Sequence, residues 1–565
     1  MKKYIFLIIT LFAFGCEDYL DTQDYLSKND QNFPESSTDV DQMLTGAYYS
    51  MMKVNLNSTY YIGALASDEQ FGSGAANDAD AHGFDRWLAS NPNMAHNIWS
   101  NYYEGIYRVN KLLEAVGQVN WSSEEHKSRA TGEAYFLRAF FYSELSKLFG
   151  EVPLLIKSDP VNIPQTPADE TYAQIASDLQ MAIDLLPSEQ YNSDPAMYGH
   201  ATKWAAQALL ARVYLFYTGY YDQNNLPLPD GGSIEKSEVV QNLEDLITNS
   251  GHHLINDFRN LWAYTNELTK EDYAYTQGEG LQWAGENNAE SVFAIHYTLI
   301  NGWGDPRNVI AQAFGVRGQS NVNNVFPFGG VWGHGQINPR FVDSWVASAP
   351  EDEIRRWGSV LDVEHPREGI VKYETGGWNM VEETKLFPKK LTIIRAFTDK
   401  SAPNREDWLS FNINIIMDGM QQGFNNASIE NLVLIRYADV LLMHSELTET
   451  KDNLNVVRDR AGLDPVAAYS LDHIKQERHH ELAFEGIRFY DLLRWYGDDA
   501  GAIIDQSQNG AELLNDKVPG VFQANLTDRI KDTGGFMQIP EQEILLSGNV
   551  LKQNPGWTGP ESILQ

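Results

Sequence analysis

The sequence predicts a mainly α-helical protein, in which a tetratricopeptide-repeat-like helical scaffold carries a large, irregular, loop-rich insertion. Three observations support this prediction. Up to about residue 270, apolar residues recur at the three- and four-residue spacing of amphipathic helices, and these helices follow one another in pairs. From 271 to 424 this periodicity fades while glycine and tryptophan become frequent. From 425 onward the helical spacing returns.

Composition and charge restrict the class of protein. With 565 residues, 43% of them hydrophobic and 21% charged, the chain has the composition of a globular protein. Its formal net charge of -35 argues against nucleic acid or an anionic membrane surface as a partner. Most of the 14 tryptophans and 28 tyrosines are expected in the core. The surplus also suits carbohydrate, because flat aromatic faces stack on sugar rings.

The N-terminus resembles a bacterial lipoprotein signal. After a basic start, residues 4–14 are apolar but too few to span a bilayer, and after Gly15 comes Cys16, the only cysteine. We therefore expect a signal peptide over 1–15, lipidation of Cys16 and a lipidated tether over 16–40. Two or more acyl chains anchor a protein stably. The alternative is an ordinary export signal with a chance cysteine.

Residues 41–270 are predicted to form the first part of the helical scaffold. Small residues at packing positions let helix pairs stack on one another, which produces a rigid, curved scaffold. The expected helices lie within 39–49, 98–116, 132–156, 172–186 and 201–217. Residues 64–87 are expected to form an irregular loop. The Asp78–Asp80 spacing in this loop lacks the glycine and closing glutamate of a calcium loop, so we predict no metal site.

The insertion, residues 271–424, is the expected ligand-binding region, because binding residues concentrate in loops held by a rigid scaffold. Trp303 and Trp332 lie in Gly-flanked loop sequence and are the first candidates for stacking on a ligand. Arg317 and Asn323 are candidates for hydrogen bonds to hydroxyl groups. The alternative for each of these residues is a structural role in the core.

Residues 425–565 form the C-terminal helical part. Leu434, Ala438 and Leu441 recur at helical spacing, and a later helix is expected from Asp472 to Phe484. That helix places three carboxylates at i, i+4 and i+8, which would repel one another unless neutralised. They are Glu477, Glu481 and Glu485. A lattice of these carboxylates with nearby arginines, which locks the helices together, is favoured over acid–base chemistry. The six arginines are Arg436, Arg458, Arg460, Arg478, Arg488 and Arg494.

Three segments of this C-terminal part resemble the SusD/RagB family of surface nutrient-binding lipoproteins from Bacteroidetes-type bacteria. They are RYADVLLM, VRDRAGL and ERHHELAFEGIRFYDLLRW, and the tail adds an IP-x-x-E element and QNPGW. Between the first two segments the chain is several residues shorter than is usual in the family. The acidic residues that follow Cys16 resemble the surface-export signal of such lipoproteins.

The resemblance implies a SusD-like fold and a location on the outer face of the outer membrane. It also implies capture without chemistry: the protein would grip an oligosaccharide or polysaccharide and deliver it to a SusC-like TonB-dependent transporter, with no cofactor. Loops similar to 64–87 line the ligand face in this family, so Asp68 and Trp87 join the candidate ligand contacts.

Two alternatives remain open. The first is a peptide-binding, RagB-like lid of the same kind of importer, in which aromatic stacking would matter little. The second is a secreted glycoside hydrolase, which would need two carboxylates facing each other across a groove. The chain contains no HExxH, GxSxG or P-loop pattern, and we therefore expect no enzymatic activity.

Overall fold

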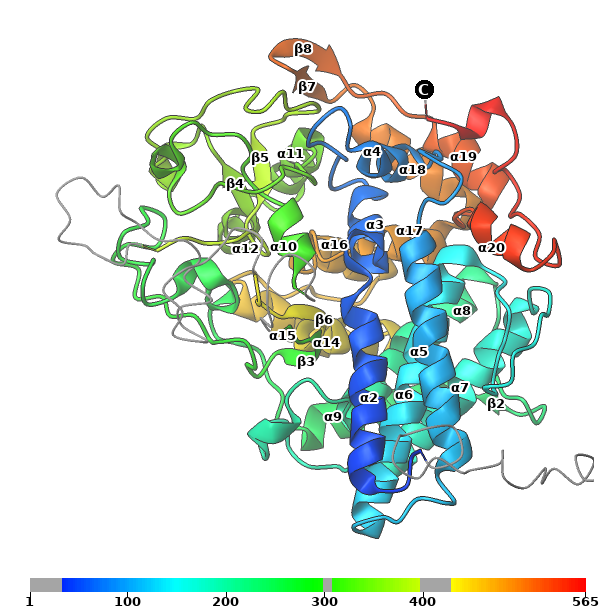
Figure 1. Cartoon of the computed structure of the whole chain (residues 1–565). Helices are drawn as coiled ribbons and strands as arrows, with labels where there is room; N and C mark the ends of the chain where they lie inside the picture. The colour runs from blue at the N-terminus through cyan, green and yellow to red at the C-terminus, as the bar shows by residue number, and fades with distance from the viewer. Residues whose placement is uncertain (1–32, 298–306, 397–427, 565) are drawn as a thin grey trace, which may run out of the picture.

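The computed structural model describes residues 33–297, 307–396 and 428–564. The described chain is dominated by α-helices, and the predicted mainly α fold is confirmed. Antiparallel helices fill one half of the molecule, and short helices, short strands and long loops fill the other (Figure 1). The N-terminal helices are α2 (Ser37–Met52), α3 (Thr59–Leu65), α4 (Ala79–Arg86), α5 (His96–Ala115), α6 (Glu124–Phe149), α7 (Ala168–Leu185), α8 (Lys203–Tyr220) and α9 (Lys236–Asn249).

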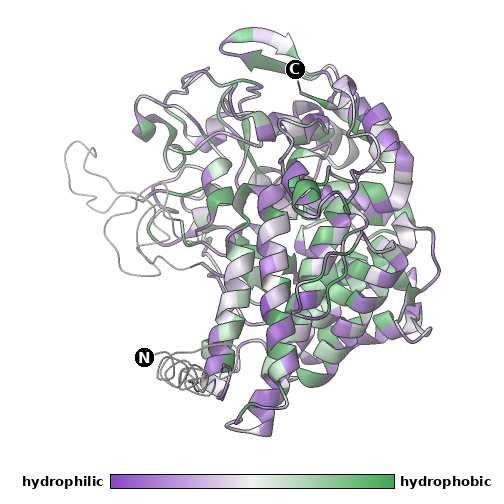
Figure 2. Ribbon diagram, turned by 45° about the vertical axis from the view of Figure 1, so that its right-hand side comes forward, coloured by the Kyte–Doolittle hydropathy of each residue, from purple (hydrophilic) through white to green (hydrophobic). Residues whose placement is uncertain are grey.

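The helical half is built by successive helices packed against their neighbours, with α2 on α5, α5 on α6, α6 on α7 and α7 on α8. Glycines allow two of these approaches. A Cβ on Gly105 would meet the Phe141 ring at 2.5 Å, and one on Gly132 would meet Leu186 at 2.9 Å. Hydrophobic residues concentrate in the interior of this half (Figure 2). One continuous core joins these helices to those of the C-terminal part.

The C-terminal helices return onto the same core, where α14 packs on α9 and α17 packs on α8. Leu434 does not begin a helix as predicted, because its apolar run forms β6, which pairs antiparallel with β3. The predicted helix from Asp472 to Phe484 is capped by Ser470 and ends at Glu481. These helices are α14 (Tyr437–Thr448), α15 (Asp452–Arg460), α16 (Leu471–Glu481), α17 (Arg488–Tyr496), α18 (Ala500–Gln508), α19 (Leu526–Thr533) and α20 (Glu541–Leu546).

Two smaller hydrophobic cores lie in the loop-rich part; one also includes residues between 258 and 264, and the other includes Ala483 and Phe484. Its helices are α10 (Val309–Ala313), α11 (Pro339–Ser348) and α12 (Glu353–Ser359). The strands form two-stranded antiparallel pairs throughout. They are β1 (Leu226–Pro227) with β2 (Ser233–Ile234), β3 (Ser291–Ile295) with β6 (Leu432–Arg436), β4 (Val360–Asp362) with β5 (Leu386–Pro388), and β7 (Glu512–Asn515) with β8 (Val518–Val521).

The predicted arginine–carboxylate lattice is present and buried. Glu481 binds Arg436 at 3.0 Å and Arg355 at 3.2 Å, and it also contacts Arg460. These guanidinium groups hold the pKa of Glu481 far below its ordinary value, although burial alone would raise it. Glu477 is bound by Arg355 and Arg458, and Glu485 by Arg436 and Lys390.

Three of the six predicted arginines serve other carboxylates. Arg478 binds Asp439 and Asp491, Arg488 binds Asp68, and Arg494 binds Glu446. Arg355 and Lys390, from the loop-rich part, bind the three carboxylates instead. The lattice therefore joins distant parts of the chain.

Candidate functional site

An exposed tryptophan in the loop-rich part marks a surface that we call the Trp378 surface. It is formed by Asp78, the N-cap residue of α4, together with Arg317, Trp332, His334 and Trp378. The Trp378 residue is 58% exposed. Arg317 holds the loop of Trp378 in place. Its Nη1 donates to the Trp332 carbonyl at 2.8 Å, and its Nη2 donates to the Trp378 carbonyl at 3.3 Å. The guanidinium carbon of Arg317 lies 5.6 Å from the Trp378 ring centroid. One arginine therefore ties together both tryptophans of the surface.

The local sequence explains why Trp378 points outward. Gly318 and Gly377 lie so close that a Cβ on either would overlap the backbone of the other. Trp378 and Asn379 both have positive φ angles, 53° and 54°, which side chains rarely adopt. Such strained residues persist where the surrounding structure holds them, often at binding sites.

Asp78 and His334 form the polar side of the Trp378 surface. His334 Nε2 lies 3.1 Å from Asp78 Oδ2, and His334 Nδ1 lies 2.6 Å from the Tyr61 hydroxyl. Burial alone would raise the pKa of Asp78, but His334 and the Ala75 N–H hold it below its ordinary value. Asp78 therefore presents an ionised carboxylate, an acceptor for hydroxyl groups, beside the tryptophans.

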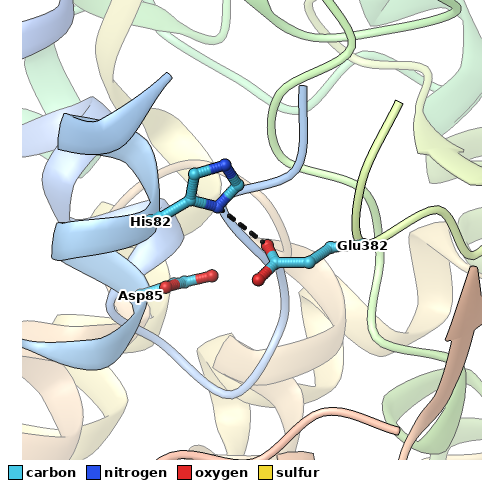
Figure 3. Close-up of side chains that lie close together, drawn as sticks. All are labelled: His82, Asp85 and Glu382. Atoms are coloured by element: carbon cyan, nitrogen blue, oxygen red, sulfur yellow. Dashed lines mark hydrogen bonds and ion pairs between the residues drawn. The ribbon is translucent and has the colours of Figure 1, made fainter. Parts of the chain in front are cut away.

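A group of four charged residues, the buried charge tetrad, lies under this surface: His82, Asp85, Arg86 and Glu382. Figure 3 shows three of them converging from α4 and from the loop that follows Trp378. His82 Nδ1 lies 3.3 Å from Glu382 Oε2, and Arg86 binds both carboxylates. Burial alone would lower the pKa of His82, but Glu382 raises it to about 9. The tetrad thus connects α4 to the loop that follows Trp378.

Three members of the tetrad have the ligand types and proximity of a metal site. All four carboxylate oxygens already have partners, however. Arg86 binds one oxygen of Asp85 and one of Glu382, and the second oxygens accept from the Gly72 and Ser73 N–H groups at 2.7 and 2.9 Å. A metal ion would have to displace Arg86, so we interpret the tetrad as an ion-pair cluster.

Two predicted ligand contacts are wrong in this structure. Asp68 is buried and accepts two hydrogen bonds from Arg488, each 2.9 Å long. Burial would raise its pKa, but Arg488 lowers it to about 2. Trp87 has no exposed surface, and the centroid of its ring lies 4.8 Å from that of the Phe489 ring. The expected loop over 64–87 contains α4, and Trp87 is the C-cap residue of that helix.

The remaining predicted residues have different outcomes. Arg317 and Trp332 come together at the Trp378 surface, as described above. Asn323 is half-buried in a short 3-10 helix further along the same loop. Cys16 and Trp303 lie outside the described residues. Trp378 was not among the predicted contacts, although two preceding glycines, the signal used for Trp332, also mark it.

The helices of the described residues include none that is both long and apolar enough to cross a membrane.

Two family models match the chain. One, described as "Starch-binding associating with outer membrane", matches residues 18–215, and the other, the SusD family, matches residues 366–557. Among curated proteins, a SusD-like protein of Bacteroides ovatus is 24% identical over 88% of this chain and 83% of its own length. SusD-like protein P2 of Formosa agariphila is 25% identical over 99% of this chain and 100% of its own.

Solved structures show the same fold. A laminarin binding SusD-like protein superposes with a TM-score of 0.69 at 24% identity, covering 92% of this chain and 100% of its own. Surface glycan-binding protein A from Bacteroides thetaiotaomicron, in complex with laminarihexaose, superposes with a TM-score of 0.67 at 19% identity over the same shares.

Proposed function

Since this chain belongs to the SusD family, we propose that it is a cell-surface glycan-binding protein whose ligand contacts the Trp378 surface. The observation that carries the proposal is the indole of Trp378, which is 58% exposed and whose ring centroid lies 5.6 Å from the guanidinium carbon of Arg317. A sugar ring stacked on that indole would remove its apolar face from water. Arg317 and Asp78 supply a donor and an acceptor beside the ring for sugar hydroxyls.

The relatives support the choice of a glycan over a peptide. One neighbour binds laminarin and another is held in complex with laminarihexaose, so laminarin is the first polysaccharide to test. A peptide gripped by its backbone would engage an exposed strand edge or a groove with main-chain partners. The most exposed feature at the Trp378 surface is instead an aromatic side chain.

Membrane attachment and delivery complete the proposal. Lipidation at Cys16 would anchor the protein to the outer membrane, in keeping with the family description of proteins associating with that membrane. A SusC-like TonB-dependent transporter would receive the captured oligosaccharide or polysaccharide. In this role the protein binds and releases its ligand without cleaving it.

Affinity electrophoresis in native gels containing laminarin tests the proposal. Wild-type protein is expected to migrate more slowly than in a gel without polysaccharide, and Trp378→Ala is expected to abolish the retardation. Tyr107→Ala is the matched control, because it removes an aromatic residue that is 48% exposed on α5. Equal retardation of wild type and Trp378→Ala in each polysaccharide that retards the wild type would show that the site is elsewhere. Appearance of shortened laminarin products would show an enzyme.

A further inference from the structure

Two arginines converge on one tryptophan at a second place in the loop-rich part. The guanidinium carbon of Arg367 lies 3.5 Å from the centroid of the Trp357 ring, and that of Arg356 lies 5.2 Å from it. Arg356 and Trp357 belong to α12, and Arg367 comes from the 3-10 helix Pro366–Glu368. The half-buried indole thus has two guanidinium groups on it.

Neither arginine forms an ion pair with any of the described residues, although the chain carries a formal net charge of -35. Arg356 is 2% exposed and uses Nη1 and Nη2 on the carbonyls of Ala349 and Pro350, at 3.0 and 3.1 Å. Its buried Nε has no hydrogen-bond partner. The nearby carboxylate of Asp352 already accepts from Arg355. Neither guanidinium group therefore contacts a carboxylate of the described residues directly, although Glu351, Asp352 and Glu353 lie close enough to act on the charge of Arg356.

The surroundings of Arg367 leave one edge of its guanidinium group open. Its backbone N–H and its Nε donate to His365 Nδ1 at 3.2 and 3.0 Å. Because two donors face Nδ1, neutral His365 carries its proton on Nε2, which makes that atom a further donor at the exposed surface. The Nη1 and Nη2 groups of Arg367 have no partner within the described part of the chain. This edge has the fork geometry that binds a carboxylate or sulfate with two parallel hydrogen bonds.

We propose that Arg367, supported by Arg356 and Trp357, forms a binding site for an oxyanion, the carboxylate or sulfate group of an acidic sugar. An anion at the open edge of Arg367 would relieve the repulsion between the two guanidinium groups. Burial lowers the pKa of Arg356; the charges of Asp352 and Glu353 offset this in part, and the charge of Arg367 lowers the pKa further. Stacking on Trp357 fixes the plane of Arg367, so little conformational freedom is lost on binding. The site goes beyond the proposed binding of laminarin at the Trp378 surface.

Titration calorimetry of the purified chain at low salt tests this site with sodium sulfate, sodium glucuronate and glucose as probes. We expect sulfate and glucuronate to bind and to compete with each other, and glucose to give no heat from this site. Arg367→Gln should weaken anion binding by about tenfold or more, because it removes both the charge and the fork. Arg367→Lys keeps the charge and should still bind several-fold more weakly than wild type.

Lys372→Gln is the control for net charge, because its side chain is 65% exposed and lies 3.5 Å from Glu374. It should bind the anions as wild type does. If glucuronate binds more tightly than sulfate, the site is assigned to uronic acids. If sulfate binds more tightly than glucuronate, it is assigned to sulfate esters. The proposal is overturned if wild type binds neither anion, or if Arg367→Gln binds them unchanged. In laminarin gels, Arg367→Gln is expected to be retarded as wild type is. This measurement reports separately on the Trp378 surface.

Discussion

Gly318 and Gly377 lie backbone against backbone beneath the exposed Trp378. A Cβ built on Gly318 would be 2.3 Å from the carbonyl carbon of Gly377, and one built on Gly377 would be 2.1 Å from the Gly318 carbonyl oxygen. No real Cβ approaches a backbone atom so closely, so one loop must move if either glycine is replaced. This contact sets how far Trp378 stands from Arg317.

Gly318→Ala is expected to weaken laminarin binding by about tenfold or more, because the displaced loop carries Trp378 away from Arg317. Affinity electrophoresis or calorimetry measures the loss. Gly231→Ala is the matched control: Gly231 also has a positive φ, 86°, but a Cβ there would meet nothing within 4 Å. If both variants bind as wild type does, the close contact of the two loops does not position the site.

Arg317→Lys is expected to weaken glycan binding although it keeps the positive charge. A lysine ammonium group lacks the planar fork that lets Arg317 donate to the carbonyls of Trp332 and Trp378 together. The two loops should separate, and binding should fall by about as much as in Arg317→Gln. Calorimetry with laminarin measures all three proteins. Full binding by Arg317→Lys would instead assign Arg317 a purely electrostatic role.

Glu481→Gln is expected to reduce the free energy of unfolding by about 3–5 kcal/mol, because it leaves buried guanidinium groups without their carboxylate. Arg355, Arg436 and Arg460 all contact Glu481. Urea unfolding followed by circular dichroism measures the change. Glu449→Gln, at an ion pair with Lys236 in which the side chains are 67% and 49% exposed, should cost less than about 1 kcal/mol. If Glu481→Gln reduces the free energy of unfolding as little as Glu449→Gln does, the lattice adds no stability.

His82→Gln is expected to remove part of the pH dependence of stability. The pKa of His82 is about 9 in the folded protein, above the ordinary value, so its protonated form stabilises the fold fully below about pH 6.5. That stabilisation, on the order of 1–3 kcal/mol, is lost as the pH rises toward 9. Urea unfolding from about pH 7 to 9 should therefore show wild type losing more stability than His82→Gln.

Asp85, whose pKa burial raises to about 7, still titrates at the lower end of this range, so the comparison rests on its upper half, where Asp85 is ionised. His253→Gln, at an exposed histidine, is the control and should keep the wild-type pH dependence. Parallel curves for wild type and His82→Gln would contradict a protonated His82 in the tetrad.

Local sequence patterns predicted the scaffold well. Helices expected within 98–116 and 172–186 are found as α5, His96–Ala115, and α7, Ala168–Leu185, because an amphipathic helix depends mainly on its own apolar spacing and end signals. The charge pattern of α16 likewise predicted a neutralising lattice. Arg355 and Lys390 could not be assigned to it, because they come from parts of the chain about 90 to 130 residues away.

By itself, the sequence determined the helical scaffold, the family and the loop-rich part in which Arg317 and Trp332 lie. Only the tertiary structure decided which tryptophans face solvent. Trp87 is buried by partners such as Thr533 and Trp557, more than 400 residues further along the chain, whereas Trp378 is held outward by a contact between two glycines. A tryptophan in irregular sequence has no periodic pattern to report its burial, so its environment depends on contacts that only the folded chain creates.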